Sequence, residues 1–266
     1  MRLDTLLVER GLAESRAQAQ RLVMAGQVRV DGQVALKPAL SVVTNARLEV
    51  DLGPRYVSRG GEKLQAALEA FRIDPGNRVC ADVGASTGGF TDCLLQHGAR
   101  RVYAVDVGKG ILHWKLRQDP RVAVMEETNA RYLRALPEKV SLVTVDAAFI
   151  SLKILLPVLR GWLAPEGEVL ALVKPQFEAG REAAARGKGV IRDPRLHRQA
   201  LLEVLSFADR QDFGLHGLMR SPLLGPKGNI EFLAWLAYPG GAEADLNELI
   251  ARVVPLEDSP SPVSEA

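Results

Sequence analysis

The chain has 266 residues, enough for one large domain and one small one. Hydrophobic residues make up 47% and charged residues 25%, as in ordinary globular proteins, and no apolar run approaches the roughly 20 residues that cross a bilayer. The start of the chain, Met1–Asp4, does not read as a signal peptide, and the two cysteines, Cys80 and Cys93, form no C-x-x-C pair. We therefore expect a cytoplasmic protein with neither a metal site, a disulfide framework nor a membrane anchor.

The formal net charge of +2 is unevenly distributed along the chain. Residues 241–266 carry six acidic and one basic side chain, a net charge of −5, which leaves +7 for the other 240 residues. A basic surplus favours nucleic-acid phosphate as a partner, although many soluble proteins carry a similar balance.

Residues 1–53 are predicted to form a separate small α+β module. Spaced leucines predict a short first helix that ends at Gly11, and Ser15 is placed to cap a second helix over 16–25. Polar and apolar residues then alternate over 27–36 around the pair Asp31-Gly32, which predicts a two-stranded hairpin.

This order of elements resembles the small RNA-binding module of ribosomal protein S-four. The resemblance rests on Arg2-Leu3-Asp4, Glu9-Arg10-Gly11, Ser15-Arg16, Ala17–Val23 and Gly26-Gln27-Val28-Arg29-Val30-Asp31-Gly32. It implies that basic side chains of the module meet RNA backbone, and the candidates are Arg2, Arg10, Arg16, Arg21 and Arg29. For any one of these arginines, a solvated surface position is the alternative.

Residues 54–58 are predicted to be a linker, because Pro54 restricts the chain and no periodic pattern crosses it. Over 59–240, apolar runs alternate with helical patterns, which predicts an α/β domain with helices on both faces of a parallel sheet. Its expected strands are 78–83, 101–106, 121–126, 141–146 and 168–173, and two more at 213–221 and 230–238 would close one edge in antiparallel fashion, giving a seven-stranded sheet. Residues 241–266 are predicted to hold a terminal helix, over 245–253, and an acidic tail.

The glycine-rich turn Asp82-Val83-Gly84-Ala85-Ser86-Thr87-Gly88-Gly89-Phe90 follows the first of these strands and precedes a helix. Glycines let a ligand approach the backbone, and a helix start offers free N–H groups. The spacing differs from the G-x-G-x-x-G of dinucleotide folds and favours S-adenosylmethionine, which has no pyrophosphate. Asp106, at the end of the next strand, is placed to accept hydrogen bonds from ribose hydroxyls. A tight turn without a ligand is the alternative.

Opposite charges follow two further predicted strands, Asp146 after 142–145 and Lys174 after 169–173. Ligands of open α/β sheets bind at the carboxyl ends of the strands, so both side chains are expected to face the cleft. A surface ion pair is the alternative.

Nearly the whole chain resembles the TlyA family. Members of this family are sometimes labelled hemolysin A, and their larger domain is of the FtsJ type. The resemblance rests on Ser58-Arg59-Gly60-Gly61-Glu62-Lys63-Leu64, the glycine-rich turn, Asp146-Ala147-Ala148-Phe149-Ile150-Ser151, Val173-Lys174-Pro175-Gln176-Phe177-Glu178 and Gly228-Asn229-Ile230-Glu231-Phe232. It implies a Rossmann-like class I methyltransferase that uses S-adenosylmethionine to methylate the ribose 2′-oxygen of a cytidine in ribosomal RNA.

The family's catalytic tetrad falls on Lys63, Asp146, Lys174 and Glu231. Lys174 is then the candidate to steer or take the hydroxyl proton, with Asp146 positioning it. For the cofactor, Asp82 and Gly84 are expected near the methionine moiety, Asp106 at the ribose and Thr128 and Asn129 beside the adenine. The turn itself would be lined by Ser86, Thr87 and Gly88. Ala148 departs from a serine that relatives often carry, without touching the tetrad.

The sequence lacks the residues that two other kinds of RNA methylation require. Base N-methylation usually shows an Asp/Asn-Pro-Pro-aromatic run where this chain has Asp146-Ala147-Ala148-Phe149, and cytosine C5 methylation needs a cysteine in the cleft. The loop 180–193 is expected either to fold over RNA or to lie free on the surface.

Two other classes of function stay open at this level. A non-catalytic ribosome-binding or assembly factor would have no need of all four tetrad residues, and a hemolysin would need an apolar span or a strongly amphipathic cationic helix. The sequence specifies neither the modified nucleotide, nor the ribosomal subunit, nor the oligomeric state.

Overall fold

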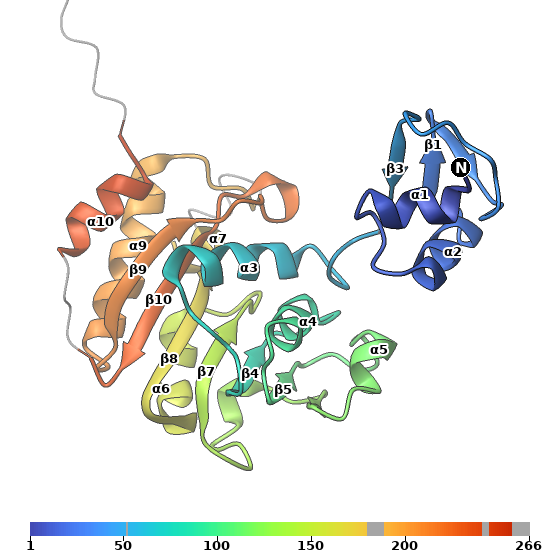
Figure 1. Cartoon of the computed structure of the whole chain (residues 1–266). Coiled ribbons are helices and arrows are strands. Elements are labelled where there is room, and N and C mark those ends of the chain that lie inside the picture. Colours follow the sequence, from blue (N-terminus) through green and yellow to red (C-terminus); the bar gives the residue numbers. More distant parts are fainter. Residues whose placement is uncertain (52, 180–188, 241–244, 257–266) are drawn as a thin grey trace, which may run out of the picture. The chain divides into compact units, whose positions relative to one another are not determined.

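The computed structural model describes residues 1–51, 53–179, 189–240 and 245–256, and these residues divide into two compact units that meet in sequence between Arg55 and Tyr56. Figure 1 shows the chain and its element labels. Each unit has its own hydrophobic core.

The first unit consists of two helices and a three-stranded antiparallel sheet. Its elements are α1 (Leu3–Glu9), α2 (Arg16–Met24), β1 (Val28–Val30), β2 (Gln33–Ala35) and β3 (Leu48–Val50). The Ser15 side chain accepts a hydrogen bond from the Gln18 backbone N–H, which is the predicted cap of α2. The predicted hairpin β1–β2 is also confirmed, but β3, which pairs with the other edge of β1, was not predicted.

The second unit is built on a seven-stranded sheet whose strands lie in the order β6-β5-β4-β7-β8-β10-β9. The strands are β4 (Val79–Val83), β5 (Arg101–Val105), β6 (Val122–Met125), β7 (Val140–Val145), β8 (Leu163–Val173), β9 (Gly214–Arg220) and β10 (Phe232–Tyr238). The first five are mutually parallel, and β10 runs antiparallel to both β8 and β9. The predicted seven-stranded α/β fold is therefore confirmed, including its antiparallel edge.

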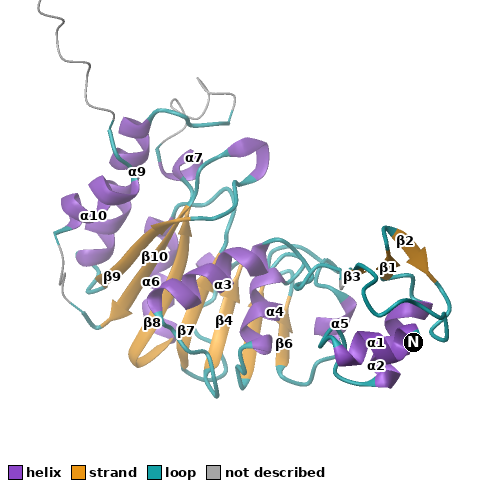
Figure 2. Ribbon diagram, turned by 45° about the horizontal axis from the view of Figure 1, so that its top comes forward, coloured by secondary structure: helices purple, strands orange, loops and turns teal. Residues whose placement is uncertain are grey.

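Helices cover both faces of this sheet, as Figure 2 shows. They are α3 (Gly60–Phe71), α4 (Gly89–Gln96), α5 (Trp114–Arg117), α6 (Leu152–Trp162), α7 (Pro175–Glu178), α9 (Pro194–Asp209) and α10 (Leu246–Val253), with short 3-10 turns η1 (Ala130–Tyr132) and η2 (Pro226–Gly228). Because strand side chains alternate, Cys80 packs on the side of α3 and α4, and its neighbour Ala81 packs on the side of α6 and α9.

Tyr56, in the segment predicted as a linker, belongs to the second core. Its ring is buried among residues of α3 and α4, and a Cβ added at Gly61 would lie 2.2 Å from that ring. Gly61 is therefore needed for the close approach of Tyr56 to the start of α3. Asp245 caps α10, where a terminal helix was predicted, and Ile250 of that helix is buried in the core.

Candidate active site

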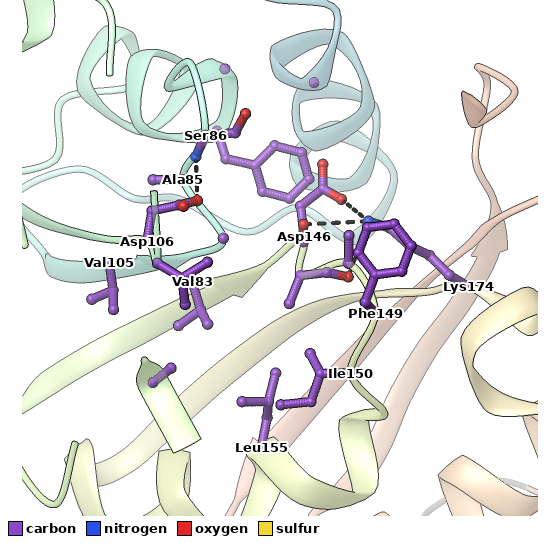
Figure 3. Close-up of a pocket in the computed structure, with 18 of the residues that line it drawn as sticks. Val83, Ala85, Ser86, Val105, Asp106, Asp146, Phe149, Ile150, Leu155 and Lys174 are labelled. Atoms are coloured by element: carbon purple, nitrogen blue, oxygen red, sulfur yellow. Dashed lines mark hydrogen bonds and ion pairs between the residues drawn. The ribbon is translucent and has the colours of Figure 1, made fainter. Parts of the chain in front are cut away.

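A pocket of about 850 Å³ opens at the carboxyl ends of the parallel strands, where β4 lies between β5 and β7 and the strand order reverses. This switch point is where ligands bind in open α/β sheets. The pocket is lined by the turn after β4, the ends of β5 and β7, the start of α3 and the residues that flank β8 and β10. Figure 3 shows ten of the lining residues with labels.

The glycine-rich turn forms one wall of the pocket. Gly84 has a φ of +81°, and a Cβ there would lie 2.8 Å from the carbonyl oxygen of Asp146, so only glycine fits without displacing the backbone. The Asp106 carboxylate accepts a hydrogen bond from the backbone N–H of Ser86 at 2.8 Å (Figure 3) and another from that of Gly108 at 2.7 Å. Asp106 thus ties the turn to the end of β5 and lies at the pocket wall.

Two residues predicted for the cofactor do not line the pocket. Asp82 is fully buried on the α4 face of β4, where its carboxylate accepts from the hydroxyls of Thr91, at 2.7 Å, and Thr144, at 3.2 Å. Strand alternation turns its side chain beneath the pocket, so Asp82 does not line the wall at which the methionine moiety is expected. Burial raises the pKa of Asp82 to about 7, against the opposing effect of those two hydrogen bonds.

Gly88 is the second such residue, and it packs closely against α5. It has a φ of +100°, and a Cβ there would lie 2.1 Å from a methyl of Leu116 on α5. The other predicted cofactor residues, Gly84, Ser86, Thr87, Asp106, Thr128 and Asn129, all line the pocket. The Asn129 side chain also accepts from the backbone N–H of Arg131 and so caps η1.

The four predicted catalytic side chains line the same pocket, as two ion pairs. Lys174 Nζ lies 2.5 Å from Asp146 Oδ1 and donates to the backbone oxygens of Ala147, at 3.1 Å, and of Asp146, at 3.3 Å (Figure 3). Because these residues follow the neighbouring strands β7 and β8, the sheet itself brings the opposite charges together.

The second pair joins residues 168 positions apart in the sequence. Lys63, in the first turn of α3, donates from Nζ to Glu231 Oε2 at 2.6 Å, and Glu231 directly precedes β10. Lys63 and Glu231 are both buried, so each charge is paired at the site, as the cost of desolvating a charge requires. A Cβ at Gly225 would lie 2.1 Å from Glu231 Oε1, so this glycine makes room for the carboxylate.

Phe149 is a pocket residue to which the sequence assigned no role. It is 89% exposed, has a φ of +62° and lies with its ring centroid 5.1 Å from that of Phe177. An aromatic side chain held in the open beside Lys174 and Asp146 can stack on a base. Its position within the quoted Asp146–Ser151 motif was the signal that could have found it.

Glu178 holds the loop that carries Phe149. Its buried carboxylate accepts from the Ser151 hydroxyl, at 2.5 Å, and from the Leu152 N–H, at 2.8 Å, at the start of α6. Burial raises the pKa of Glu178. The two cysteines, Cys80 and Cys93, are buried away from the pocket, and burial raises the pKa of the Cys80 thiol to about 12, so neither offers a nucleophile to the cleft.

Four of the five candidate RNA-binding arginines of the first unit have partners within that unit. Arg2 and Arg16 pair with Asp4, Arg10 donates to the backbone oxygens of Thr44 and Ala46, and Arg29 donates to that of Gly32. The fifth, Arg21, is exposed on α2 and makes no side-chain hydrogen bond or ion pair with any described residue.

Among the residues that the structure describes, no group of three His, Cys, Asp or Glu side chains could hold a metal ion. In the same part of the chain, no helix is both long and apolar enough to traverse a bilayer. Residues 180–188 of the predicted 180–193 loop lie outside the described residues.

Comparisons with known proteins agree with this geometry. An FtsJ-like methyltransferase model matches residues 56–238, and an S4 domain model matches residues 1–48. The chain is 50% identical to YqxC of Bacillus subtilis, over 95% of this chain and 92% of that one. It is 49% identical to the 16S/23S rRNA (cytidine-2′-O)-methyltransferase TlyA of Mycobacterium tuberculosis, over 88% and 89%.

A solved structure from Streptococcus thermophilus that carries a hemolysin designation is also similar, with a TM-score of 0.71 and 43% identity over 95% of each chain. The family model for the larger domain covers more than half of the chain, and the relatives match nearly from end to end. The chain therefore belongs to the TlyA family of FtsJ-like methyltransferases, with an S4 domain at its N-terminal end.

Proposed function

We propose that the protein transfers a methyl group from S-adenosylmethionine to the ribose 2′-oxygen of a cytidine in ribosomal RNA. The observation that carries this proposal is the convergence of Lys63, Asp146, Lys174 and Glu231 on one pocket, next to the glycine-rich turn. The family relatives named for cytidine 2′-O-methylation support the substrate.

The pocket has the features that this cofactor requires. Its wall combines a glycine turn, the Asp106 carboxylate for ribose hydroxyls, and apolar side chains such as Val83 and Ile111 for the adenine. We assign Gly84, Ser86, Thr87, Asp106, Thr128 and Asn129 to the cofactor. When bound, the cofactor supplies a sulfonium methyl that is electrophilic without a metal ion.

The residues of the chain then act on the ribose hydroxyl. Lys174, held by Asp146 and two backbone oxygens, orients the 2′-hydroxyl. It passes one of its own protons to the Asp146 carboxylate and takes the hydroxyl proton in its place as the methyl is transferred. The bond from the ribose oxygen to the methyl carbon forms as the carbon–sulfur bond breaks, and the proton passes through the Lys174–Asp146 pair to water. Holding the oxygen in line with the sulfonium supplies much of the rate acceleration.

Lys63 and Glu231 complete the other side of the ribose pocket, and Phe149 provides a ring on which the target base stacks. In this assignment residues 1–53 bind RNA and residues 59–240 carry out the transfer, joined by 54–58 and followed by the acidic segment 241–266. Ribosomal subunits are the partners, which places the protein in the cytoplasm.

The test is transfer of tritiated methyl from S-adenosylmethionine to deproteinised rRNA and to separate ribosomal subunits. Lys174→Ala is expected to lower the transfer rate at least about 100-fold, the lower range for loss of a positioned acid–base group, with cofactor affinity unchanged. Lys153→Ala is the matched control, because Lys153 lies outside the pocket and pairs with Glu203. Full transfer by Lys174→Ala would refute the assignment, and no transfer by the wild type to any of these RNAs would refute the proposed function.

A further inference from the structure

A fully buried carboxylate, Asp4, joins the two helices of the N-terminal unit to two of its arginines. Arg2 donates two hydrogen bonds to it, from Nε to Oδ1 at 3.0 Å and from Nη2 to Oδ2 at 2.8 Å. From the start of α2, Arg16 donates Nε to Oδ2 at 3.1 Å and Gln20 donates Nε2 to the same oxygen at 3.0 Å. The Thr5 hydroxyl adds a longer bond to Oδ1, at 3.4 Å, so five donors from four side chains converge on one carboxylate.

The two arginines remain open to solvent at their outer edges. The side chain of Arg2 is 46% exposed and that of Arg16 is 57% exposed, although Asp4 between them is inaccessible. A guanidinium carries five N–H groups, so Arg2, which uses two, keeps three for a ligand, and Arg16, which uses one, keeps four. Both Nη groups of Arg16 are among those that stay available.

The charges of this cluster do not cancel. Two guanidinium groups share one carboxylate, which leaves a net positive patch. Of the other candidate arginines of this unit, Arg10 and Arg29 are bonded to backbone oxygens. A long side chain normally loses rotamer freedom when it binds a ligand. Here the loss occurs on folding instead, because Asp4 already holds both side chains in place. The hydrogen bonds to Arg2 keep the pKa of Asp4 well below its usual range, so the clamp stays charged.

We infer that Asp4 is a positioning residue that holds Arg2 and Arg16 as a fixed guanidinium pair for the backbone phosphates of RNA. This inference rests on the proposed function, which makes RNA the ligand of this unit. Fork-shaped guanidinium groups bind phosphate oxygens in pairs, and a fixed fork does so at a smaller entropic cost. Arg21, which is exposed and free of side-chain partners among the described residues, acts only as a mobile charge.

For a substitution at Asp4, net charge alone and the positioning role predict opposite effects on RNA affinity. The change Asp4→Asn removes a negative charge from an RNA-binding surface, so electrostatics alone would tighten binding. If Asp4 positions the two arginines, the affinity for RNA instead falls by about 10-fold, because both side chains are released. Glu49→Gln is the matched control: it removes one negative charge from an exposed ion pair with Arg47 on the same unit and is expected to leave affinity equal or slightly higher.

A second pair of variants keeps the charge and needs no change at the buried residue. Arg16→Lys retains the positive charge but loses the fork that Asp4 holds, and is expected to weaken binding about 5-fold or more. Arg21→Lys, on the same helix, is expected to stay within about 2-fold of the wild type, because only its charge counts. Both side chains are exposed, so neither change threatens the fold.

The experiment measures the affinity of the full chain for deproteinised 16S and 23S rRNA at about 0.1 M salt, together with methyl transfer at saturating RNA. Weaker binding by both Asp4→Asn and Arg16→Lys, with both controls near the wild type, supports the inference. Unchanged or tighter binding by Asp4→Asn overturns it. So does loss of binding in Asp4→Asn alone, because a purely structural role for Asp4 would leave Arg16→Lys unaffected. A wild type that binds this RNA but never methylates RNA would instead refute the proposed function.

Discussion

Replacing Asp82 with asparagine is expected to change how the stability of the larger unit depends on pH. Asp82 is fully buried beneath the pocket, and its carboxylate accepts hydrogen bonds from the hydroxyls of Thr91 and Thr144 and from the Thr91 backbone N–H. Asparagine has nearly the same shape and can bond to both hydroxyls, because a hydroxyl donates or accepts. The variant therefore removes the ionisation of Asp82 and little else.

The sign of the effect follows from the direction of the pKa shift. Burial raises the pKa of Asp82 from 3.8 to about 7, so the folded state binds a proton that the unfolded state has released between these values. The stability that this proton contributes is fully present below pH 3.8 and is lost as the pH rises to about 7. From about pH 5 to pH 8 the wild type thus loses stability relative to Asp82→Asn, by about 2 to 3 kcal/mol at roughly 1.36 kcal/mol per pKa unit.

The assay is urea unfolding followed by tryptophan fluorescence at about pH 5 and pH 8. All three tryptophans, Trp114, Trp162 and Trp235, lie in the larger unit, so the signal reports on that unit alone. Asp119→Asn is the control, because hydrogen bonds from Arg121 lower the pKa of Asp119 and its effect on stability should not change in this range. A difference between Asp82→Asn and wild type that stays constant from pH 5 to pH 8 would refute the reasoning.

Three further substitutions test the pocket. Gly84→Ala places a Cβ 2.8 Å from a backbone oxygen at a φ of +81°, so we expect a loss of roughly 1–3 kcal/mol in urea unfolding and weaker cofactor binding by calorimetry. Glu231→Gln leaves the buried ammonium of Lys63 without its charge partner, and is expected to cost about 3 kcal/mol in the same unfolding assay and to slow methyl transfer. Phe149→Ala removes an exposed ring, so stability should stay within about 0.5 kcal/mol, whereas KM for RNA should rise about 10-fold in steady-state kinetics, with cofactor affinity unchanged.

The sequence predicted the sheet well because its parallel strands are buried apolar runs that end in charged residues. It also predicted that Asp146 and Lys174 would meet, since they end strands that prove to be neighbours. It missed β3, because the alternation of Leu48-Glu49-Val50 is only three residues long and the strand pairs with one about 20 residues earlier in the chain. The short run of Leu48–Val50 becomes a strand only because β1 offers it a free edge.

The differences between the expected and the observed pocket lining have a physical cause as well. Asp82 was assigned to the cofactor by its position in the motif, but which face of β4 it occupies depends on the packing of α4. The pairing of Lys63 with Glu231, across 168 positions, could be reached only through the family resemblance, because no local pattern links α3 to β10. The exposure of Phe149 depends on a backbone conformation that its own sequence does not favour.

In the proposed function, the pocket directs methyl transfer to a ribose oxygen. The most direct measurement labels rRNA with tritiated S-adenosylmethionine and the wild-type protein, then hydrolyses the RNA and separates its nucleosides. We predict that the label is found in 2′-O-methylcytidine, within a dinucleotide that alkali cannot cleave because its 2′-oxygen is blocked. Label in a base-methylated nucleoside, released by alkali as a single nucleotide, would contradict the account.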